Sequence, residues 1–276
     1  FQTFWTSFTA RKFCIICTSM NESIIISGLA MVVVAAVSAI VGVFALTRRM
    51  TLAADALSHV ALPGLGFALM VKADPLIGGG AALLLGAFLV WAIEKRTKIA
   101  TEAIIGVIFS ASLAIGSLLI ESDEELLEAL FGEAGSITAR EAFFGVAAAI
   151  IIAAIIFRLK ERLLLSFISV DIAKTAGLNV NRLNLAFLVI FAATVVLGLK
   201  FLGVLLTGSL IIVPAAASRN LARSFDTDIS LAVIVAAVSV AVGIPLALAY
   251  GKETGPAVIA VASAIFFLSL FFKKKE

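Results

Sequence analysis

Residues 22–46 read ESIIISGLAMVVVAAVSAIVGVFAL, a run in which Glu22 is the only charged residue. About 20 apolar residues in a helix are enough to cross the hydrocarbon core of a bilayer, which is about 30 Å thick. Lipid offers the backbone no hydrogen-bond partners, so a run of this length is typical of an α-helix that satisfies its own polar groups. The stretch therefore predicts a membrane-spanning helix.

The same kind of run recurs along the whole chain. Hydrophobic residues make up 62% of the sequence and the mean hydropathy is +1.17, whereas a soluble domain has about 45–50% apolar residues. The composition predicts an all-α polytopic membrane protein with about eight or nine transmembrane helices. The predicted spans are approximately 22–46, 57–71, 77–93, 101–120, 142–158, 183–199, 203–218, 229–249 and 255–272.

Two of these spans leave room for more than one interpretation. The span at 57–71 is short and contains Pro63 and Gly64, which predicts a bent or discontinuous helix. The stretch 183–218 can be counted as one long span or two, because only Lys200 interrupts it. The 20 glycines and the alanine-rich runs suit helices that pack closely in lipid.

The basic residues predict how the chain is oriented in the membrane. Loops on the cytoplasmic side of membrane proteins carry an excess of Lys and Arg. With nine spans, 15 of the 21 basic residues fall on one side, which we expect to be cytoplasmic. These residues are Arg48, Arg49, Lys95, Arg96, Lys98, Arg158, Lys160, Arg162, Lys174, Arg182, Arg219, Arg223, Lys273, Lys274 and Lys275.

A polar break at 121–132 is rich in acidic residues and falls on the opposite, external side. Ser122 and Glu125 have the spacing of a capping box, which predicts a short amphipathic helix. Its carboxylates could gather cations or meet a partner. They could equally be a solvated face, and the sequence leaves the two open.

A second polar break runs from Leu159 to Arg182. Within it, Ser169 is a favourable N-cap, Asp171 falls in the first turn, and Gly177 is a favourable helix stop. The pattern predicts a short helix of two turns on the cytoplasmic surface. Such a helix serves either as a simple connector or as a docking site for a soluble partner.

Motifs typical of catalysis do not occur in the sequence. The chain has no Gly-x-x-x-x-Gly-Lys-[Ser/Thr] phosphate loop, no His-Glu-x-x-His zinc motif and no Gly-x-Ser-x-Gly elbow. We therefore expect that it is not an enzyme. Cys14 and Cys17 lie within residues 1–19, an unassigned N-terminal extension on which we base no function.

The polar pair Asp55 and His59 stands out against these apolar surroundings. His59 is the only histidine, and residues at i and i+4 share one face of a helix. Carboxylate and imidazole groups together suit zinc, manganese or ferrous iron. One chain supplies only two such ligands, whereas a two-fold dimer supplies four. The alternative is a structural role, with His59 bonded to a carbonyl and Asp55 acting as a helix N-cap.

Several segments resemble the permease subunits of the ABC-3 family of ATP-binding-cassette importers. The likeness extends over about residues 22–272. It rests on ADALSHVALPG at 54–64, VDIAKTAGLNV at 170–180, LKFLGVLLTGSLIIVPAAAS at 199–218 and, more weakly, ALFG at 129–132 with Ile137 and Thr138. One departure is Ala54, where the family often has glycine.

The resemblance implies a multi-pass permease of the cell membrane that imports zinc, manganese or iron(II). Residues 20–276 would form the permease domain. The implied partners are a cytoplasmic ATP-binding subunit, an extracytoplasmic metal-binding protein and a second copy of the chain. Asp55 and His59 would be metal ligands in the permeation path. No cofactor would be permanently bound, since the metal ion is the cargo.

The resemblance also gives roles to residues outside this pair. Asp171, Ala173 and Gly177 would belong to the segment that couples the permease to the ATPase, and Pro214 would occupy a helix-bending position. Two rival functions remain open. One is a permease for a metal chelate, and the other is a proton-coupled secondary metal transporter that works without an ATPase.

Overall fold

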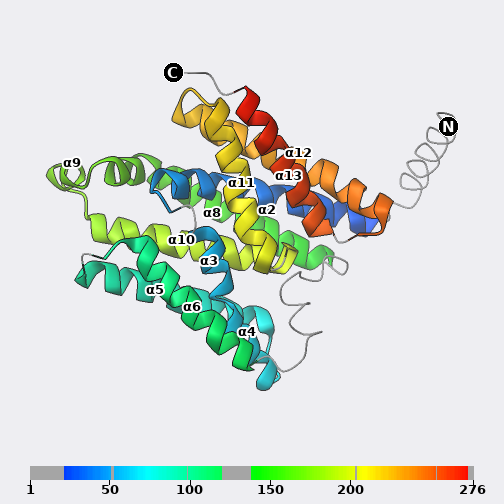
Figure 1. Cartoon of the computed structure of the whole chain (residues 1–276), viewed down its shortest axis with the longest axis horizontal. Coiled ribbons are helices and arrows are strands. Elements are labelled where there is room, and N and C mark those ends of the chain that lie inside the picture. Colours follow the sequence, from blue (N-terminus) through cyan, green and yellow to red (C-terminus); the bar gives the residue numbers. More distant parts are fainter. Residues whose placement is uncertain are drawn as a thin grey trace.

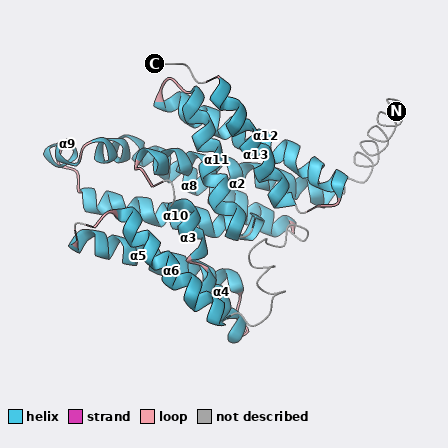
Figure 2. Cartoon of the chain, viewed as in Figure 1, coloured by secondary structure: helices cyan, strands magenta, loops and turns pink. Residues whose placement is uncertain are grey.

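The described part of the chain folds into α-helices. A computed structural model describes residues 22–50, 53–97, 99–119, 138–202, 204–252 and 254–272. Every regular element in these ranges is a helix (Figure 1, Figure 2). The helices are α2 (Glu22–Thr47), α3 (Ala53–His59), α4 (Leu62–Met70), α5 (Pro75–Arg96), α6 (Thr101–Leu119), α8 (Ala139–Ile168), α9 (Val170–Thr175), α10 (Val180–Leu202), α11 (Val204–Leu221), α12 (Phe225–Tyr250) and α13 (Thr254–Phe271).

Seven of the helices within the described ranges are long and apolar enough to cross a membrane. They are α2, α5, α6, α8, α10, α12 and α13. A shorter apolar segment, Asp55–Met70, lies between α2 and α5. The prediction of an all-α polytopic membrane protein is confirmed. The acidic stretch at 121–132 lies outside the described residues.

The structure resolves the two ambiguous spans. The span predicted at 57–71 is discontinuous, because α3 ends at His59 and α4 begins at Leu62. The stretch 183–218 forms two helices, α10 and α11, that pack against each other.

The helix of the fifth predicted span, 142–158, extends beyond that span. Helix α8 continues to Ile168 through Lys160, Glu161 and Arg162. Leu163 and Ser166 extend its buried face along the same helical stripe. A charged segment marks where a helix leaves lipid, but the backbone can stay helical in water as long as one face remains packed.

Helix α2 lies at the centre of the bundle, where it packs against α8, α11 and α12 and more lightly against α10 (Figure 1). Helices α5 and α6 form one flank with α4, and α12 and α13 form the other. Helix α10 joins the first flank to the centre because it packs on both α5 and α8.

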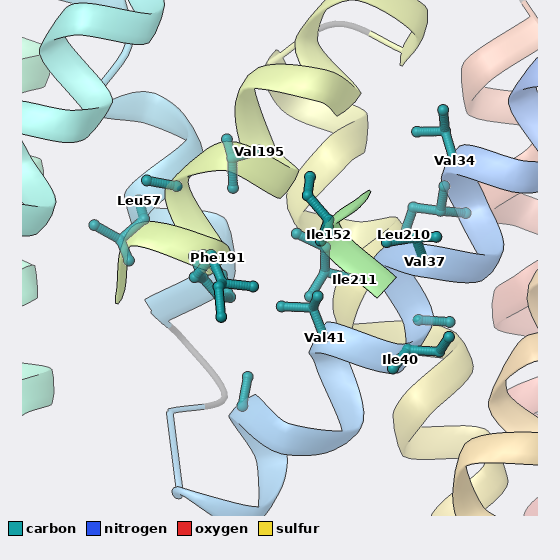
Figure 3. Close-up of a cluster of buried hydrophobic side chains, with 14 of the residues drawn as sticks. Val34, Val37, Ile40, Val41, Leu57, Ile152, Phe191, Val195, Leu210 and Ile211 are labelled. Atoms are coloured by element: carbon teal, nitrogen blue, oxygen red, sulfur yellow. The ribbon is translucent and has the colours of Figure 1, made fainter. Parts of the chain in front are cut away.

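A cluster of buried hydrophobic side chains lies where α2, α8, α10 and α11 meet. Figure 3 shows Val37 and Val41 of α2 beside Ile211 of α11, with Ile152 of α8 and Phe191 of α10 closing the cluster. All five side chains are buried. Leu57 brings α3 into the same cluster, so the short helix is anchored in the centre of the bundle.

Helices α4 and α5 approach each other backbone to backbone. A Cβ atom built on Gly64 would lie 2.1 Å from the carbonyl oxygen of Gly78, and one built on Gly78 would lie 2.2 Å from that of Gly64. On its other side, α4 packs against α6, where a Cβ on Gly116 would lie 2.9 Å from the Cβ of Leu62. Small residues therefore hold α4 between two neighbours, as expected for helices packed in lipid.

Ion pairs join helix ends that the basic-residue pattern places on the same side. Arg48, after α2, pairs with Glu94 near the end of α5 at 2.9 Å. Lys160 of α8 pairs with Asp226 at the start of α12. At the opposite ends of their helices, Lys200 of α10 pairs with Glu141 of α8 at 2.8 Å. These pairings agree with the predicted alternation of the spans, and the direction across the membrane stays a prediction.

Candidate functional site

Asp55 and His59 lie at the two ends of the short helix α3. Asp55 is exposed in the first turn, and His59 is the last residue. The Ser58 hydroxyl donates a hydrogen bond to the backbone carbonyl of Asp55 at 2.6 Å, which leaves the carboxylate itself out of this contact. Because the residues are four apart, the carboxylate and the imidazole share one face of the helix.

The imidazole of His59 is half-buried against α6. Its ring centroid lies 5.5 Å from that of Phe109, with the two rings tilted by 58°. Its Nδ1 atom is buried and has no hydrogen-bond partner among the described residues. A buried nitrogen without a partner is costly, and such groups in native proteins call for a specific explanation.

The geometry does not favour the structural role that we considered for the pair. A structural histidine would bond to a neighbouring carbonyl, but Nδ1 makes no such bond. Asp55 is the third residue of α3 and therefore does not occupy the N-cap position.

The break after His59 is held by short-range turns. Val60 donates its amide to the carbonyl of Leu57 at 3.1 Å, and Ala61 donates to that of Ser58 at 3.3 Å. Pro63 has no amide hydrogen and lies in the first turn of α4, where no partner within the helix is needed. The proline therefore favours a new helix start directly after the histidine, which leaves His59 at a helix end inside the bundle.

The neighbours of α3 are mainly α11 and α6. Pro214 lies inside α11, and the helix is continuous through it. Within the described ranges, no group of three or more His, Cys, Asp or Glu side chains could hold a metal ion. The described part of one chain thus brings together two candidate ligands, in line with the count made from the sequence.

The predicted short helix in the second polar break is α9. The Ser169 hydroxyl caps it by accepting a hydrogen bond from the amide of Ile172 at 3.3 Å. At its end, Gly177 has a φ of 77° and donates to Lys174, while Leu178 donates to the carbonyl of Ala173. This pair of bonds is a Schellman motif, whose left-handed residue is most often glycine.

The three residues expected in the coupling segment do not share one environment. Asp171 and Gly177 are exposed, but Ala173 is fully buried beneath the helix. The exposed surface also includes Ile168 and Ile172, which are 76% and 56% exposed. Sequence reasoning missed these two isoleucines, of which Ile168 ends α8 and Ile172 lies in α9. Helix α9 therefore presents a mixed apolar and charged surface at one end of the molecule (Figure 1).

A bundle of long apolar helices with two polar groups held at a helix break is the architecture of a membrane transport protein. The chain belongs to the ABC 3 transport family, which it matches over residues 20–273.

Named relatives and a solved structure agree with this family. The high-affinity zinc uptake system membrane protein ZnuB of Haemophilus influenzae is 29% identical, over 88% of this chain and 95% of that protein. The manganese transport system membrane protein MntC of Listeria monocytogenes is 29% identical, over 89% of each chain. The structure of PsaBC from Streptococcus pneumoniae in complex with Fab is similar with a TM-score of 0.82 and 25% identity, over 97% of each chain.

Family membership confirms the resemblance seen in the sequence. The chain is a multi-pass permease subunit of the cell membrane and is not itself the catalytic subunit. Membership in an ATP-binding-cassette family also implies an ATPase and a binding protein as partners.

Proposed function

We propose that this permease imports a divalent transition metal ion, with Asp55 and His59 as ligands in its path. The observation that carries the proposal is the unpartnered, buried Nδ1 of His59 on the same helix face as Asp55. A metal ion would supply the missing partner, and nitrogen with oxygen ligands suits zinc, manganese and iron(II). The names of the zinc and manganese relatives support this class of cargo.

A second copy of the chain would complete the ligand set. Two ligands are too few for a tetrahedral ion, and two-fold symmetry would double them to two carboxylates and two imidazoles. A site shared between copies would also come apart readily when the copies move. This suits transport, because the ion must leave as well as enter.

The proposal is tested by metal uptake into proteoliposomes that contain the permease, its ATPase subunit and its binding protein. His59→Ala should reduce uptake of Zn²⁺ and Mn²⁺ at least about tenfold, since groups around a metal site contribute on that scale. Ser110→Ala, which removes an exposed hydroxyl bonded within α6, is the control and should leave uptake unchanged. Unchanged uptake in the His59 variant would contradict the ligand role.

The same assay separates the rival functions. Uptake that continues without the ATPase subunit and follows a proton gradient would indicate a secondary transporter. Uptake of a metal chelate with no uptake of the free ion would indicate a chelate permease. Either result would overturn the proposal.

We also propose that the permease itself holds no resident cofactor. A further part of the proposal is that α9 docks on the ATPase subunit. Ile168 at the end of α8 is exposed together with Ile172, Asp171 and Lys174 of α9. Protein interfaces combine apolar and polar side chains in this way. Gly177→Leu tests this role. A Cβ atom there meets nothing within 4 Å, so the substitution acts on the backbone at φ 77° rather than through a clash.

The left-handed conformation costs a residue other than glycine about 1–2 kcal/mol, which should reshape the end of α9. The Gly177→Leu protein should hydrolyse ATP without proportional metal uptake. Normal coupling of ATP hydrolysis to uptake would contradict the docking role.

A further inference from the structure

A buried arginine connects the docking end of the permease to the helices around the candidate metal ligands. Arg48 follows α2, and its side chain is only 9% exposed. Its guanidinium donates to both carboxylate oxygens of Glu94, at 2.9 and 3.2 Å. The Thr101 hydroxyl, at the start of α6, donates to the same carboxylate at 2.9 Å. One ionic cluster thus ties together the ends of α2 and α5 and the start of α6.

The other side of Arg48 contacts two aromatic rings. Its Cζ atom lies 5.6 Å from the ring centroid of Phe167 and 5.7 Å from that of Phe187. The two rings contact each other edge to face, 5.2 Å apart. Phe167 lies in the last turn of α8, two residues before the Ser169 cap of α9, and Phe187 lies in α10, which follows α9. The guanidinium therefore touches both helices that flank the docking helix.

The ionic cluster is linked in two ways to the helices that carry and contact the candidate ligands Asp55 and His59. Along the chain, the buried Met50 comes two residues after Arg48, and α3 begins three residues later at Ala53. Through space, Thr101 begins α6, whose Phe109 packs on His59. A planar guanidinium can hold a carboxylate with its edge while it stacks on aromatic faces, which an ammonium group cannot do equally well.

Burying Arg48 costs free energy of folding that a pair serving stability alone would not be expected to cost. Nη1 of Arg48 is buried and has no hydrogen-bond partner among the described residues. Replacing a buried ion pair with well-packed neutral residues is often neutral or stabilising. We propose that Arg48 is a positioning residue for transport, which transmits movement of α9 and its flanking helices to α3 and α6. The inference rests on the proposed function.

The test removes both charges while keeping the volume, in the double variant Arg48→Met/Glu94→Gln. Methionine keeps an apolar chain between the two rings, so the protein should fold with a thermal midpoint close to that of the unchanged chain. ATP hydrolysed per metal ion imported is measured in proteoliposomes with the ATPase subunit and the binding protein, using Zn²⁺ and Mn²⁺. The ratio should rise about tenfold, within the usual range of coupling between distant sites.

The chain offers a second cation–carboxylate–aromatic group, more exposed than the first, as a control. Lys160 pairs with Asp226, and its Nζ atom lies 5.9 Å from the ring centroid of Phe225. This is also a cation shared between a carboxylate and a phenylalanine, but it joins α8 to α12 and does not reach α3 or α6. Lys160→Met/Asp226→Asn should leave the ATP-to-metal ratio unchanged.

The outcomes separate this inference from the proposed function. If the unchanged complex shows no ATP-dependent metal uptake, the proposed function is wrong. If it imports metal and the Arg48/Glu94 variant has the same ratio, only the role of Arg48 is wrong. Should that variant fail to fold, Thr101→Val removes the hydroxyl link from α6 alone. A raised ratio in that variant supports the inference, and an unchanged ratio overturns it.

Discussion

Replacement of Gly64 by alanine should separate α4 from α5 and destabilise the permease. The new Cβ would lie 2.1 Å from the carbonyl oxygen of Gly78 and 2.7 Å from the Cβ of Ala82. Carbon and oxygen atoms in close contact lie about 3.3–3.6 Å apart, so the two backbones must move apart by about 1.2 Å. No side-chain rotation can relieve this contact, because the atom in the way belongs to the backbone.

The expected cost lies at the upper end of the range for overpacking, about 3 kcal/mol. For a chain of this size, that lowers the thermal midpoint by about 6–12 °C. The assay is thermal unfolding of the purified protein in detergent, followed by size-exclusion chromatography. Because α4 begins three residues after His59, the same variant should also lose metal uptake at a temperature where it remains folded.

Gly106→Ala is the matched control, since it is also a glycine within a described helix. A Cβ atom there meets nothing within 4 Å. Alanine is favoured over glycine in a helix by about 0.5–1 kcal/mol, so this variant should be slightly more stable than the unchanged chain. Equal midpoints for the two alanine variants would refute the close approach of α4 and α5 as the source of the effect.

Three further predictions concern local backbone features. Arg49→Gly should raise the thermal midpoint of unfolding by about 2 °C, because Arg49 has a φ of 62° and glycine adopts this conformation freely. An unchanged or lower midpoint would count against backbone strain at this residue. Thr138→Ala should cost about 1 kcal/mol in thermal unfolding, because it removes the capping box that Thr138 forms with Glu141 at the start of α8; no loss would show that the box is dispensable. Ser169→Ala should remove the N-cap of α9, at a cost of about 1 kcal/mol in the stability of that helix. The variant should then bind the ATPase subunit more weakly in a pull-down titration, and full affinity would mean that α9 needs no cap to dock.

The sequence predicted the features that depend on short stretches of chain. Apolar runs located the long helices, because lipid forces each span to satisfy its own backbone. The limits of α9 followed from Ser169 and Gly177, whose capping bonds reach only a few residues along the chain. Pro63 located the break between α3 and α4 for the same reason.

Features that depend on packing between distant segments could not be predicted in this way. The pairing of Arg48 with Glu94 joins residues 46 positions apart, and nothing near either residue indicates its partner. The burial of Ala173 depends on how α9 lies against α8, with which it packs. The continuation of α8 past its charged segment to Ile168 also depends on packing, because Leu163 and Ser166 are buried.

Ser169 ends α8 and begins α9, so the two helices meet without any intervening linker. Adding one residue to the last turns of α8 would turn everything beyond it by about 100° around the helix axis, since a helix has 3.6 residues per turn. The exposed Ile168 and Ile172 would then face a different direction. Substitutions on the exposed side of this region should be tolerated during evolution, while insertions and deletions should be eliminated. We therefore expect the length of the last turns of α8 to matter more for the direction of α9 than the identity of their exposed residues.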